Sequence, residues 1–301
     1  MKRGKAFAPG HITGLFQICD EAVDDLHKGS KGAGFALKHG VTTEISLEET
    51  SKTSLEIKLN GKHQESARVS KAVAVNFLHN TEQPLAVKIE HFVDIPVGAG
   101  FGSSGAGALS LSYAFCKALE LPLTQTQAAQ VAHVAEIQSG TGLGTVLAEW
   151  AGGLEIRTKP GAPGIGSVQQ VPLEKDYIVV CITLGTIDTR SILSNRETRD
   201  RINISGNHLL RILLKKPNLR SFLEFSQEFA RKVGLCSRTV LEILDKASER
   251  GIICSMPMFG NAVFSLVEEY QLDPLLEIFS RYGEDERVLI SKIDCKGARL
   301  L

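Results

Sequence analysis

A run of glycines and serines at residues 96–109 limits what this chain can fold into more than any other feature. Before the run, apolar and charged residues alternate over residues 85–95, which is the period of a half-buried strand. After it, apolar residues recur at helical spacing over residues 103–119, and Pro122 ends the pattern. A strand, a glycine loop and a helix N-terminus together present unpaired backbone N–H groups and a positive dipole end to an anion.

The glycines in this run favour a ligand-binding loop over a plain one. Gly105 and Gly107 fall within the expected helix, where each glycine costs about 1 kcal/mol relative to alanine. Two such costs in a short run indicate that something approaches the backbone closely. We interpret that partner as a nucleotide phosphate, with a flexible surface loop as the alternative.

Two other nucleotide-binding motifs compete with this interpretation. Residues 100–105 fit the spacing G-x-G-x-x-G of dinucleotide-binding folds, and Glu120 lies downstream. In such a fold the preceding strand is covered on both faces and is continuously apolar, whereas this strand carries Lys88 and Glu90 on one face. A P-loop is excluded because the sequence contains no G-x-x-x-x-G-K-[ST].

The length and composition of the chain indicate how many domains it has and argue against several classes of binding partner. A chain of 301 residues exceeds the usual size of a single hydrophobic core, so we expect two domains. Lysine and arginine together number 34, as do aspartate and glutamate, so the charge favours neither nucleic acid nor membrane as a partner. No run approaches the roughly 18 apolar residues of a membrane span, and no signal peptide is visible. The six cysteines include no C-x-x-C pair, which argues against a cysteine metal site and favours a reduced, cytoplasmic setting.

The order of the expected elements predicts an α+β fold in two domains. Glycine and proline mark a loop at residues 159–166, and we place the domain boundary after it, giving domains 1–166 and 167–301. Strands and helices that mix in this way, with antiparallel character, favour two α+β layers. Strands are expected at residues 41–47, 55–59, 85–95, 152–157, 177–184, 262–267 and 287–293, and helices at 103–119, 125–138 (after a Thr124 cap), 205–214, 221–233, 237–249 and 272–281.

Three motifs carry a resemblance to the GHMP kinases. Residues 96–104, P-V-G-A-G-F-G-S-S, resemble the phosphate loop P-x-x-x-G-L-G-S-S-A of that superfamily. Residues 6–14 resemble its N-terminal A-P-G-K motif, with His11 where lysine is usual, and residues 255–264 resemble its third motif, with fewer glycines. Within the superfamily, the opening A-P-G-H-I-T-G and the segments 29–34, 142–144 and 258–261 are similar to the archaeal pantoate kinases.

This resemblance implies both a fold and a reaction. The fold is a two-domain one, with an N-terminal half like domain 2 of ribosomal protein S5, a ferredoxin-like C-terminal half, and the active site between them. The reaction is the ATP- and Mg²⁺-dependent phosphorylation of the primary hydroxyl of pantoate to 4-phosphopantoate, in coenzyme A biosynthesis. A homodimer is suggested by family analogy alone.

The resemblance also implies which residues form the site. It assigns nucleotide contacts to Pro96, Gly98, Gly100, Gly102, Ser103, Ser104 and Gly105. It assigns Mg²⁺ to Ser104 and Glu136, which suits a cation that prefers one or two carboxylates plus phosphate oxygens and water. Spacing alone favours an ordinary solvated residue of the helix at 125–138 for Glu136, and the family resemblance reverses that interpretation.

Acceptor contacts follow from the pantoate kinase resemblance. The implied residues are His11, Ser30, His133, Arg157 and Thr189. An arginine fork is the natural partner of the pantoate carboxylate. As alternatives, Arg157 is a surface charge at a strand end and His133 is a structural histidine. The register at Thr189 is open, because Thr186 is nearby.

One catalytic position departs from the family pattern. Many GHMP kinases place an aspartate downstream of the glutamate as a base, and pantoate kinases have G-L-G-D, but this chain has G-L-G-T ending at Thr145. A general base is worth about 10² to 10⁴ in rate, whereas phosphoryl transfer depends mainly on positioning and charge stabilisation. We therefore expect a slower kinase unless Glu149 or Asp188 substitutes. A non-catalytic binding protein and a kinase for another hydroxylated acid or alcohol are the alternatives.

Overall fold

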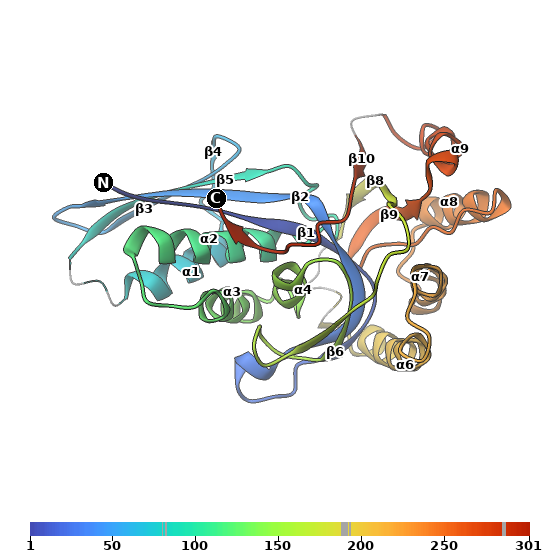
Figure 1. The fold of residues 1–301 in the computed structure, drawn as a ribbon, viewed down its shortest axis with the longest axis horizontal. Helices are drawn as coiled ribbons and strands as arrows, with labels where there is room; N and C mark the ends of the chain where they lie inside the picture. The colour runs from blue at the N-terminus through green and yellow to red at the C-terminus, as the bar shows by residue number, and fades with distance from the viewer. Residues whose placement is uncertain (80, 82, 188–191, 193, 285–286) are drawn as a thin grey trace.

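The protein, here a computed structural model, is described for residues 1–301 except 80, 82, 188–191, 193 and 285–286. Its described strands form one sheet of eight strands and one of three. The two sheets lie toward opposite ends of an elongated molecule, and helices pack on both (Figure 1).

Two long antiparallel strands, β1 (Lys2–Cys19) and β2 (Gly29–Glu49), form the centre of the first sheet. Irregularities in their pairing fall within residues 9–15, and such bulges bend a strand. The bend carries both strands from the first sheet toward the second half of the molecule (Figure 1). The sheet is completed by β5 (Leu85–Val93), β3 (Ser54–Leu59), β4 (Lys62–His63), β6 (Leu154–Lys159), β7 (Ser167–Gln170) and β11 (Arg299–Leu300).

Helices cover one face of this sheet (Figure 1). They are α1 (Arg68–Leu78), α2 (Ser103–Leu119), α3 (Gln125–Ser139) and α4 (Thr145–Ala151). α2 packs on β1 and β2 and is buried along most of its length, and Phe77 of α1 stacks on Phe115 of α2 with ring centroids 5.2 Å apart. On the opposite face Lys88 is exposed, which confirms that β5 is a half-buried strand.

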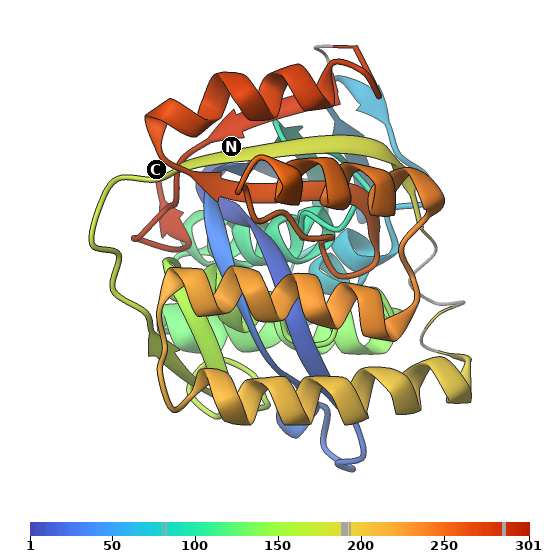
Figure 2. The same cartoon turned by 90° about the vertical axis from the view of Figure 1, so that its right-hand side faces the viewer.

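The second sheet has the strand order β10–β8–β9. Its strands are β8 (Ile178–Thr186), β9 (Gly260–Val267) and β10 (Val288–Ser291), and its helices are α8 (Arg238–Glu249) and α9 (Glu269–Phe279). Two further helices, α6 (Arg196–Leu213) and α7 (Leu219–Val233), lie side by side against β1 (Figure 2). Phe35 of β2 contacts Phe222 of α7 and Phe264 of β9, so one hydrophobic core joins the two halves.

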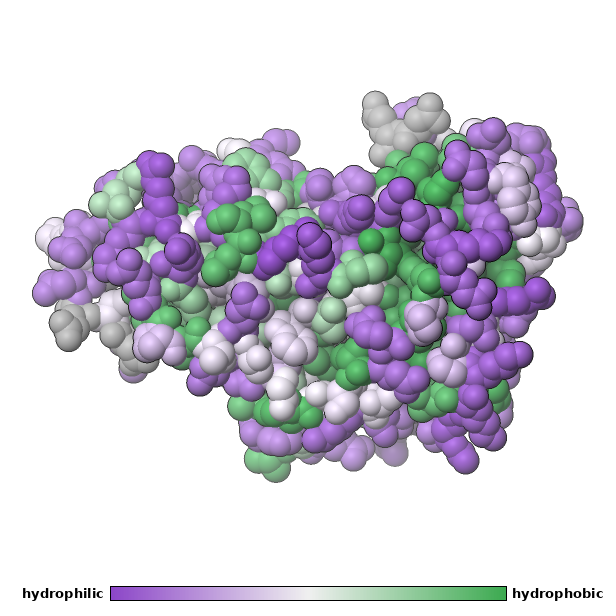
Figure 3. Space-filling view, in the orientation of Figure 1, coloured by the Kyte–Doolittle hydropathy of each residue, from purple (hydrophilic) through white to green (hydrophobic). Residues whose placement is uncertain are grey.

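Hydrophobic side chains on the face seen in Figure 3 gather where the first sheet meets the second half of the molecule. Hydrophilic side chains cover the outer ends of the same face. Across the described residues, every helix is too short or too polar to span a bilayer.

The structure confirms the α+β class, because helices and mainly antiparallel strands are mixed in both halves. α2 has the bounds that the spacing predicts. α3 begins after Thr124, whose side chain forms a capping box with Gln127 as expected for this cap. The strands predicted at 55–59, 85–95, 177–184, 262–267 and 287–293 and the helices predicted at 221–233, 237–249 and 272–281 all form, with small differences at their ends.

Other boundaries were predicted wrongly. The strand expected at 41–47 is only the second half of β2, and β1 is not among the predicted strands. The helix expected at 205–214 begins at Arg196, because Asn195 caps it by accepting the backbone N–H of Thr198. The first two turns of α6 are mostly polar, so the spacing of apolar residues does not show where the helix begins.

The connection between the halves follows the predicted loop, where Gly161 and Gly164 have positive φ. β7 follows the loop and pairs with β6, and β11 at the end of the chain pairs with β1. Residues from beyond the loop thus complete the first sheet, and the boundary after residue 166 stays a prediction.

Candidate active site

A cavity of about 320 Å³ opens at the N-terminus of α2, between the first sheet and the segment that precedes β9. It brings all three sequence motifs together. Its lining residues are His11, Thr13, Val97, Gly98, Gly100–Gly105, Glu136, Gly140–Gly142, Thr145, Ile187, Met258 and Phe259.

The glycine turn is held between β1 and the third motif. Gly98, Gly100 and Gly102 have φ of 74°, 84° and 72°, a region that favours glycine. The N–H of His11 donates to the Phe101 carbonyl over 2.9 Å, and a Cβ added to Gly100 would lie 2.7 Å from the Met258 carbonyl oxygen. The turn therefore has one conformation fixed by backbone on both sides.

α2 starts at Ser103 without a side-chain cap at Gly102. The first N–H groups of a helix have no partner within the helix, and the macrodipole places positive charge there. Because Gly102, Ser103 and Ser104 line the cavity, these donors face a space that can hold an anion. The geometry fits the phosphate-binding role predicted for this turn.

The two glycines inside α2 have different surroundings. A Cβ added to Gly105 would lie 2.7 Å from Oε2 of Glu149, so the group that approaches this glycine from behind is a protein carboxyl. A Cβ added to Gly107 would meet only Cε1 of His91, at 4.0 Å. Among the described residues, therefore, no protein group crowds Gly107, and close approach of a ligand to its backbone stays a prediction.

Ser104 and Glu136 meet at the edge of the cavity. The Ser104 hydroxyl donates to Oε1 of Glu136 over 2.5 Å, and the Thr141 hydroxyl donates to the same oxygen over 2.7 Å. Glu136 is only 3% exposed, so it is not the solvated helical residue of the alternative interpretation. Burial raises the pKa of Glu136, and the two hydroxyls oppose this shift.

The pair fits a magnesium ion that also takes phosphate oxygens and water. It supplies one carboxylate and one hydroxyl beside a turn that favours anions. Within the described part of the chain, no group of three or more histidine, cysteine or acidic side chains could hold a metal without a ligand's help. This donor set therefore suits a metal that arrives with a nucleotide.

Thr145 begins α4 and lines the cavity at the position where an aspartate is usual. A Cβ added to Gly142 would touch Oε2 of Glu136 and lie 3.5 Å from Oγ1 of Thr145, so both side chains converge there. Glu149 follows one turn later in α4, as the sequence suggested, but it lies behind the glycine turn rather than in the cavity wall. Asp188, the other proposed substitute, lies outside the described residues.

Glu149 is fully buried, and the backbone of Gly105 and Ala106 in the first turn of α2 lies against its carboxyl group. Burial raises the pKa of Glu149 well above its usual range, and the charge of Glu136 adds to the effect. A Cβ added to Gly102 would collide with the same carboxyl. Glu149 thus supports the glycine turn from inside.

A buried polar cluster reaches the cavity through His11 and Thr13, while its other two members, Glu155 and Arg157, lie behind the lining. Nε2 of His11 lies 3.0 Å from Oε1 of Glu155, and Nδ1 of His11 lies 3.3 Å from Oγ1 of Thr13. Arg157 donates to Glu155 over 2.5 Å and to Thr13 Oγ1 over 3.1 Å. Arg157 is 1% exposed, which excludes the interpretation of a surface charge at a strand end.

Two glycines of β2 make room for this cluster. Gly32 pairs with Arg157 of β6, and Gly34 pairs with Thr13 of β1. A Cβ added to Gly32 would collide with the Arg157 guanidinium, and one added to Gly34 would collide with the His11 ring. The alternation of glycines in residues 29–34 therefore lets side chains from both neighbouring strands lie across β2.

Of the predicted acceptor residues that the structure describes, His11 lines the cavity, whereas Arg157, Ser30 and His133 lie outside its lining. Ser30 of β2 is buried, its hydroxyl has no partner among the described residues, and a Cβ added to Gly144 would lie 2.7 Å from it. It is thus a free polar group next to the turn that leads into Thr145. Thr189 lies outside the described residues.

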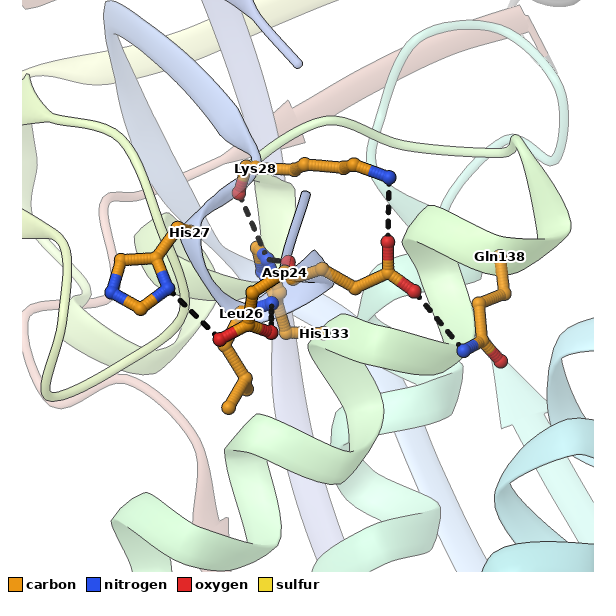
Figure 4. Close-up of polar contacts among 7 residues, drawn as sticks. Asp24, Leu26, His27, Lys28, His133 and Gln138 are labelled. Atoms are coloured by element: carbon orange, nitrogen blue, oxygen red, sulfur yellow. Dashed lines mark hydrogen bonds and ion pairs between the residues drawn. The ribbon is translucent and has the colours of Figure 1, made fainter. Parts of the chain in front are cut away.

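His133 fixes a short turn instead of facing the cavity (Figure 4). Its Nε2 lies 3.2 Å from the Asp25 carbonyl oxygen and 3.1 Å from that of Lys28, so Nε2–H donates to both. Burial lowers the pKa of His133 and favours this neutral form. The Asp25 carboxylate also bonds Lys28 over 2.7 Å and Gln138 over 3.1 Å, which ties the turn to α3.

Comparison with known proteins supports the nucleotide-binding interpretation of this cavity. The family described as the GHMP kinases N terminal domain matches residues 68–153. A pantoate kinase from Methanocaldococcus jannaschii is 33% identical over 90% of this chain and 96% of its own length. A pantoate kinase from Thermococcus kodakarensis is 35% identical over 92% of this chain and 91% of its own length. This chain belongs to the GHMP kinase family.

Solved structures support the same conclusion. A protein described as a phosphotransferase related to the CoA biosynthesis pathway matches with a TM-score of 0.90 and 30% identity, over 99% of this chain and 98% of its own. Homoserine kinase from Cytophaga hutchinsonii matches with a TM-score of 0.72 at 15% identity, over 100% of this chain and 98% of its own, which shows a shared fold. The two-domain fold of the GHMP kinases, expected from the motifs, is confirmed.

Three residues of this GHMP kinase site were not singled out by sequence reasoning. Thr13 and Glu155 belong to the buried cluster, and Thr141 bonds Glu136. A signal for Thr13 was present, because it lies two residues after His11 in a strand and therefore shares its face. No local pattern connects Glu155 to His11, since that contact depends on the pairing of distant strands.

Proposed function

We propose that this protein is a pantoate kinase, which transfers the γ-phosphoryl group of ATP to the primary hydroxyl of pantoate and forms 4-phosphopantoate. The proposal assigns it a step in coenzyme A biosynthesis and a cytoplasmic setting. The observation that carries it is one cavity that combines an uncapped helix N-terminus and a serine–glutamate pair with Thr13, whose hydroxyl accepts from the buried Arg157 behind the lining. The names of the relatives, which match nearly the whole chain, favour pantoate over other acceptors.

The nucleotide side uses backbone groups. Residues 96–105, including Pro96, Gly98 and Ser103, surround the triphosphate, and the N–H groups of the first turn of α2 stabilise its charge. Ser104 and Glu136 would hold Mg²⁺, and the bound metal would supply positive charge beside the transferred group. Because phosphoryl transfer depends on positioning and charge stabilisation, these groups supply most of the catalysis.

The acceptor side uses side chains. In this proposal His11, Ser30, His133, Arg157 and Thr189 bind pantoate or shape its site, and the positive charge of Arg157 offsets the pantoate carboxylate. In the ligand-free arrangement the Arg157 guanidinium reaches the cavity wall through Thr13. Its Nε–H has no partner among the described residues and is a free donor for a carboxylate.

Turnover of pantoate tests the proposal. The purified protein is incubated with ATP, Mg²⁺ and a panel of hydroxy acids and polyols that includes pantoate, and ADP release and the phosphorylated product are measured. We expect 4-phosphopantoate to form only when both ATP and Mg²⁺ are present. Faster turnover of another member of the panel would reassign the acceptor and leave the kinase in place.

The absence of an aspartate at Thr145 favours a second candidate, a protein that binds a nucleotide and a small acid without transferring phosphate. Retention of Ser104 and Glu136 weighs against it, since a binding protein has no need of a metal-binding carboxylate. Calorimetric binding of ATP and pantoate without any product would establish the second candidate.

A further inference from the structure

The proposed reaction releases a proton from the acceptor hydroxyl, and Thr145 cannot take it near neutral pH. The cavity wall holds another group of side chains that can. We propose that Thr13, His11 and Glu155 form a relay that takes this proton in place of the usual aspartate. The relay rests on the proposed kinase function and assigns a role to residues beyond the family's phosphate loop.

The relay begins at the cavity and leads away from it. Thr13 lines the cavity, and its Oγ1 lies 3.3 Å from Nδ1 of His11. Nε2 of the same ring lies 3.0 Å from Oε1 of Glu155. The three groups therefore form one chain of hydrogen bonds from the ligand space to a buried carboxylate.

The donors and acceptors available to each group fix the direction of these hydrogen bonds. Glu155 receives an N–H of Arg157, and an ionised carboxylate can only accept, so the proton of neutral His11 lies on Nε2. Nδ1 is then a bare acceptor for the Thr13 hydroxyl proton. Arg157 occupies one lone pair of Thr13 Oγ1, and the other is left to accept a hydroxyl from the cavity.

Proton transfer along this chain balances the reaction. The bond between the γ-phosphorus and the bridging oxygen of ATP breaks, and a bond forms between that phosphorus and the acceptor oxygen. The acceptor proton passes to Thr13 Oγ1 while the Thr13 proton passes to Nδ1 of His11. His11 becomes an imidazolium whose Nε2–H faces the Glu155 carboxylate, and its extra proton returns through Thr13 to solvent when the cavity empties.

The surroundings keep His11 ready to accept. Burial lowers the pKa of His11, while the hydrogen bond and charge of Glu155 oppose that shift and Arg157 adds to it. On the other side, Gly102 separates the His11 backbone from the Glu149 carboxyl of α4. The ring is therefore neutral at neutral pH, with a carboxylate placed to stabilise the charge that it gains.

Steady-state kinetics with ATP, Mg²⁺ and pantoate tests the relay. Thr13→Val keeps the shape of the side chain and removes the hydroxyl, so kcat is expected to fall by about 10² to 10⁴, the usual worth of a general base. Thr13→Ser restores the hydroxyl and is expected to retain most of the activity. The Kd for ATP, measured by calorimetry, stays unchanged in both variants.

The pH profile separates a relay from a purely structural role. The kcat of the unaltered enzyme is expected to fall at acid pH, where protonation of His11 adds to that of Glu136, and in His11→Gln the part of this acid limb that belongs to His11 is lost because an amide does not titrate. Thr183→Val on β8 is the matched control, since its buried hydroxyl has no partner among the described residues and it lies outside the cavity lining. Its kcat is expected to equal that of the unaltered enzyme.

The outcomes distinguish the two proposals. Turnover of pantoate by the unaltered enzyme together with equal kcat in Thr13→Val overturns the relay alone. An acid limb with the same midpoint and steepness in His11→Gln as in the unaltered enzyme also overturns it, and this profile serves equally if Thr13→Val does not fold. No turnover of any acceptor by the unaltered enzyme overturns the kinase function, and the relay with it.

Discussion

The two walls of the cavity are built in different ways. The phosphate wall, residues 98–105 with Glu136, is mostly backbone from one continuous segment, and its shape follows from glycines at positive φ. The acceptor wall, named for its proposed role, consists of His11 and Thr13 in the cavity lining with Glu155 and Arg157 behind them, and its contacting residues lie 144 positions apart in sequence. The first wall depends on local conformation, and the second on correct pairing of β1, β2 and β6.

This difference predicts where a substitution damages the fold and where it damages only the chemistry. Buried side chains in the acceptor wall carry charge, so removing one partner leaves another unpaired in the protein interior. Backbone groups in the phosphate wall have no such dependence on each other. Substitutions in the two walls can therefore test the comparison directly.

Arg157→Ala is expected to have the largest effect, because it leaves the Glu155 carboxylate buried without its arginine. Breaking a buried pair costs about 3–5 kcal/mol of the free energy of unfolding. Urea denaturation measures the loss, and Arg238→Ala is the control, since that arginine is 93% exposed in its pair with Glu242. The KM for pantoate should rise while the Kd for ATP stays unchanged, and equal stability losses at the two positions would contradict the comparison.

Glu136→Gln tests the phosphate wall, where we expect a chemical effect with little loss of stability. Without the carboxylate, the proposed Mg²⁺ site loses its anionic ligand and holds the metal less well beside the transferred phosphoryl group, so kcat is expected to fall by about 10²–10³, or about 2.7–4 kcal/mol in the barrier. The amide keeps the shape of the side chain and can still accept from Ser104 and Thr141. Steady-state kinetics across Mg²⁺ concentrations and urea denaturation together check this result. A loss in the free energy of unfolding as large as that of Arg157→Ala would contradict the difference between the two walls.

The same contrast explains what the sequence could predict. The glycine turn, α2 and α3, which carries Glu136, were predicted because each is encoded by consecutive residues with a clear period or motif. The pairing of His11 with Glu155 could not be predicted, because it depends on register across β2, where Gly32 and Gly34 leave the necessary space. The start of α6 was missed for a different reason, since a polar first turn gives no apolar signal.

Thr145→Asp tests how the walls cooperate. An aspartate at the start of α4 would face the cavity and supply the base that the family pattern places there. If the relay already takes the proton, kcat of the unaltered enzyme should rise by less than about tenfold, whereas kcat of Thr13→Val should rise more. The kcat values of the two single variants and the double variant give the coupling. Equal gains in both backgrounds would mean that the aspartate and the relay act independently.

Gly107→Ala gives the smallest expected effect and tests where along α2 the phosphate wall ends. The position is helical, and an added Cβ meets only Cε1 of His91 at 4.0 Å, so alanine is expected to stabilise the protein by about 1 kcal/mol. Gly105→Ala, two residues earlier, is the matched comparison and is expected to destabilise it, because the new Cβ would press on the Glu149 carboxyl. Urea denaturation measures both variants, and ATP titration measures whether the nucleotide still binds. A weaker affinity for ATP in Gly107→Ala would show that the nucleotide reaches deeper along α2 than the cavity lining indicates, and the phosphate wall would then extend past residue 105.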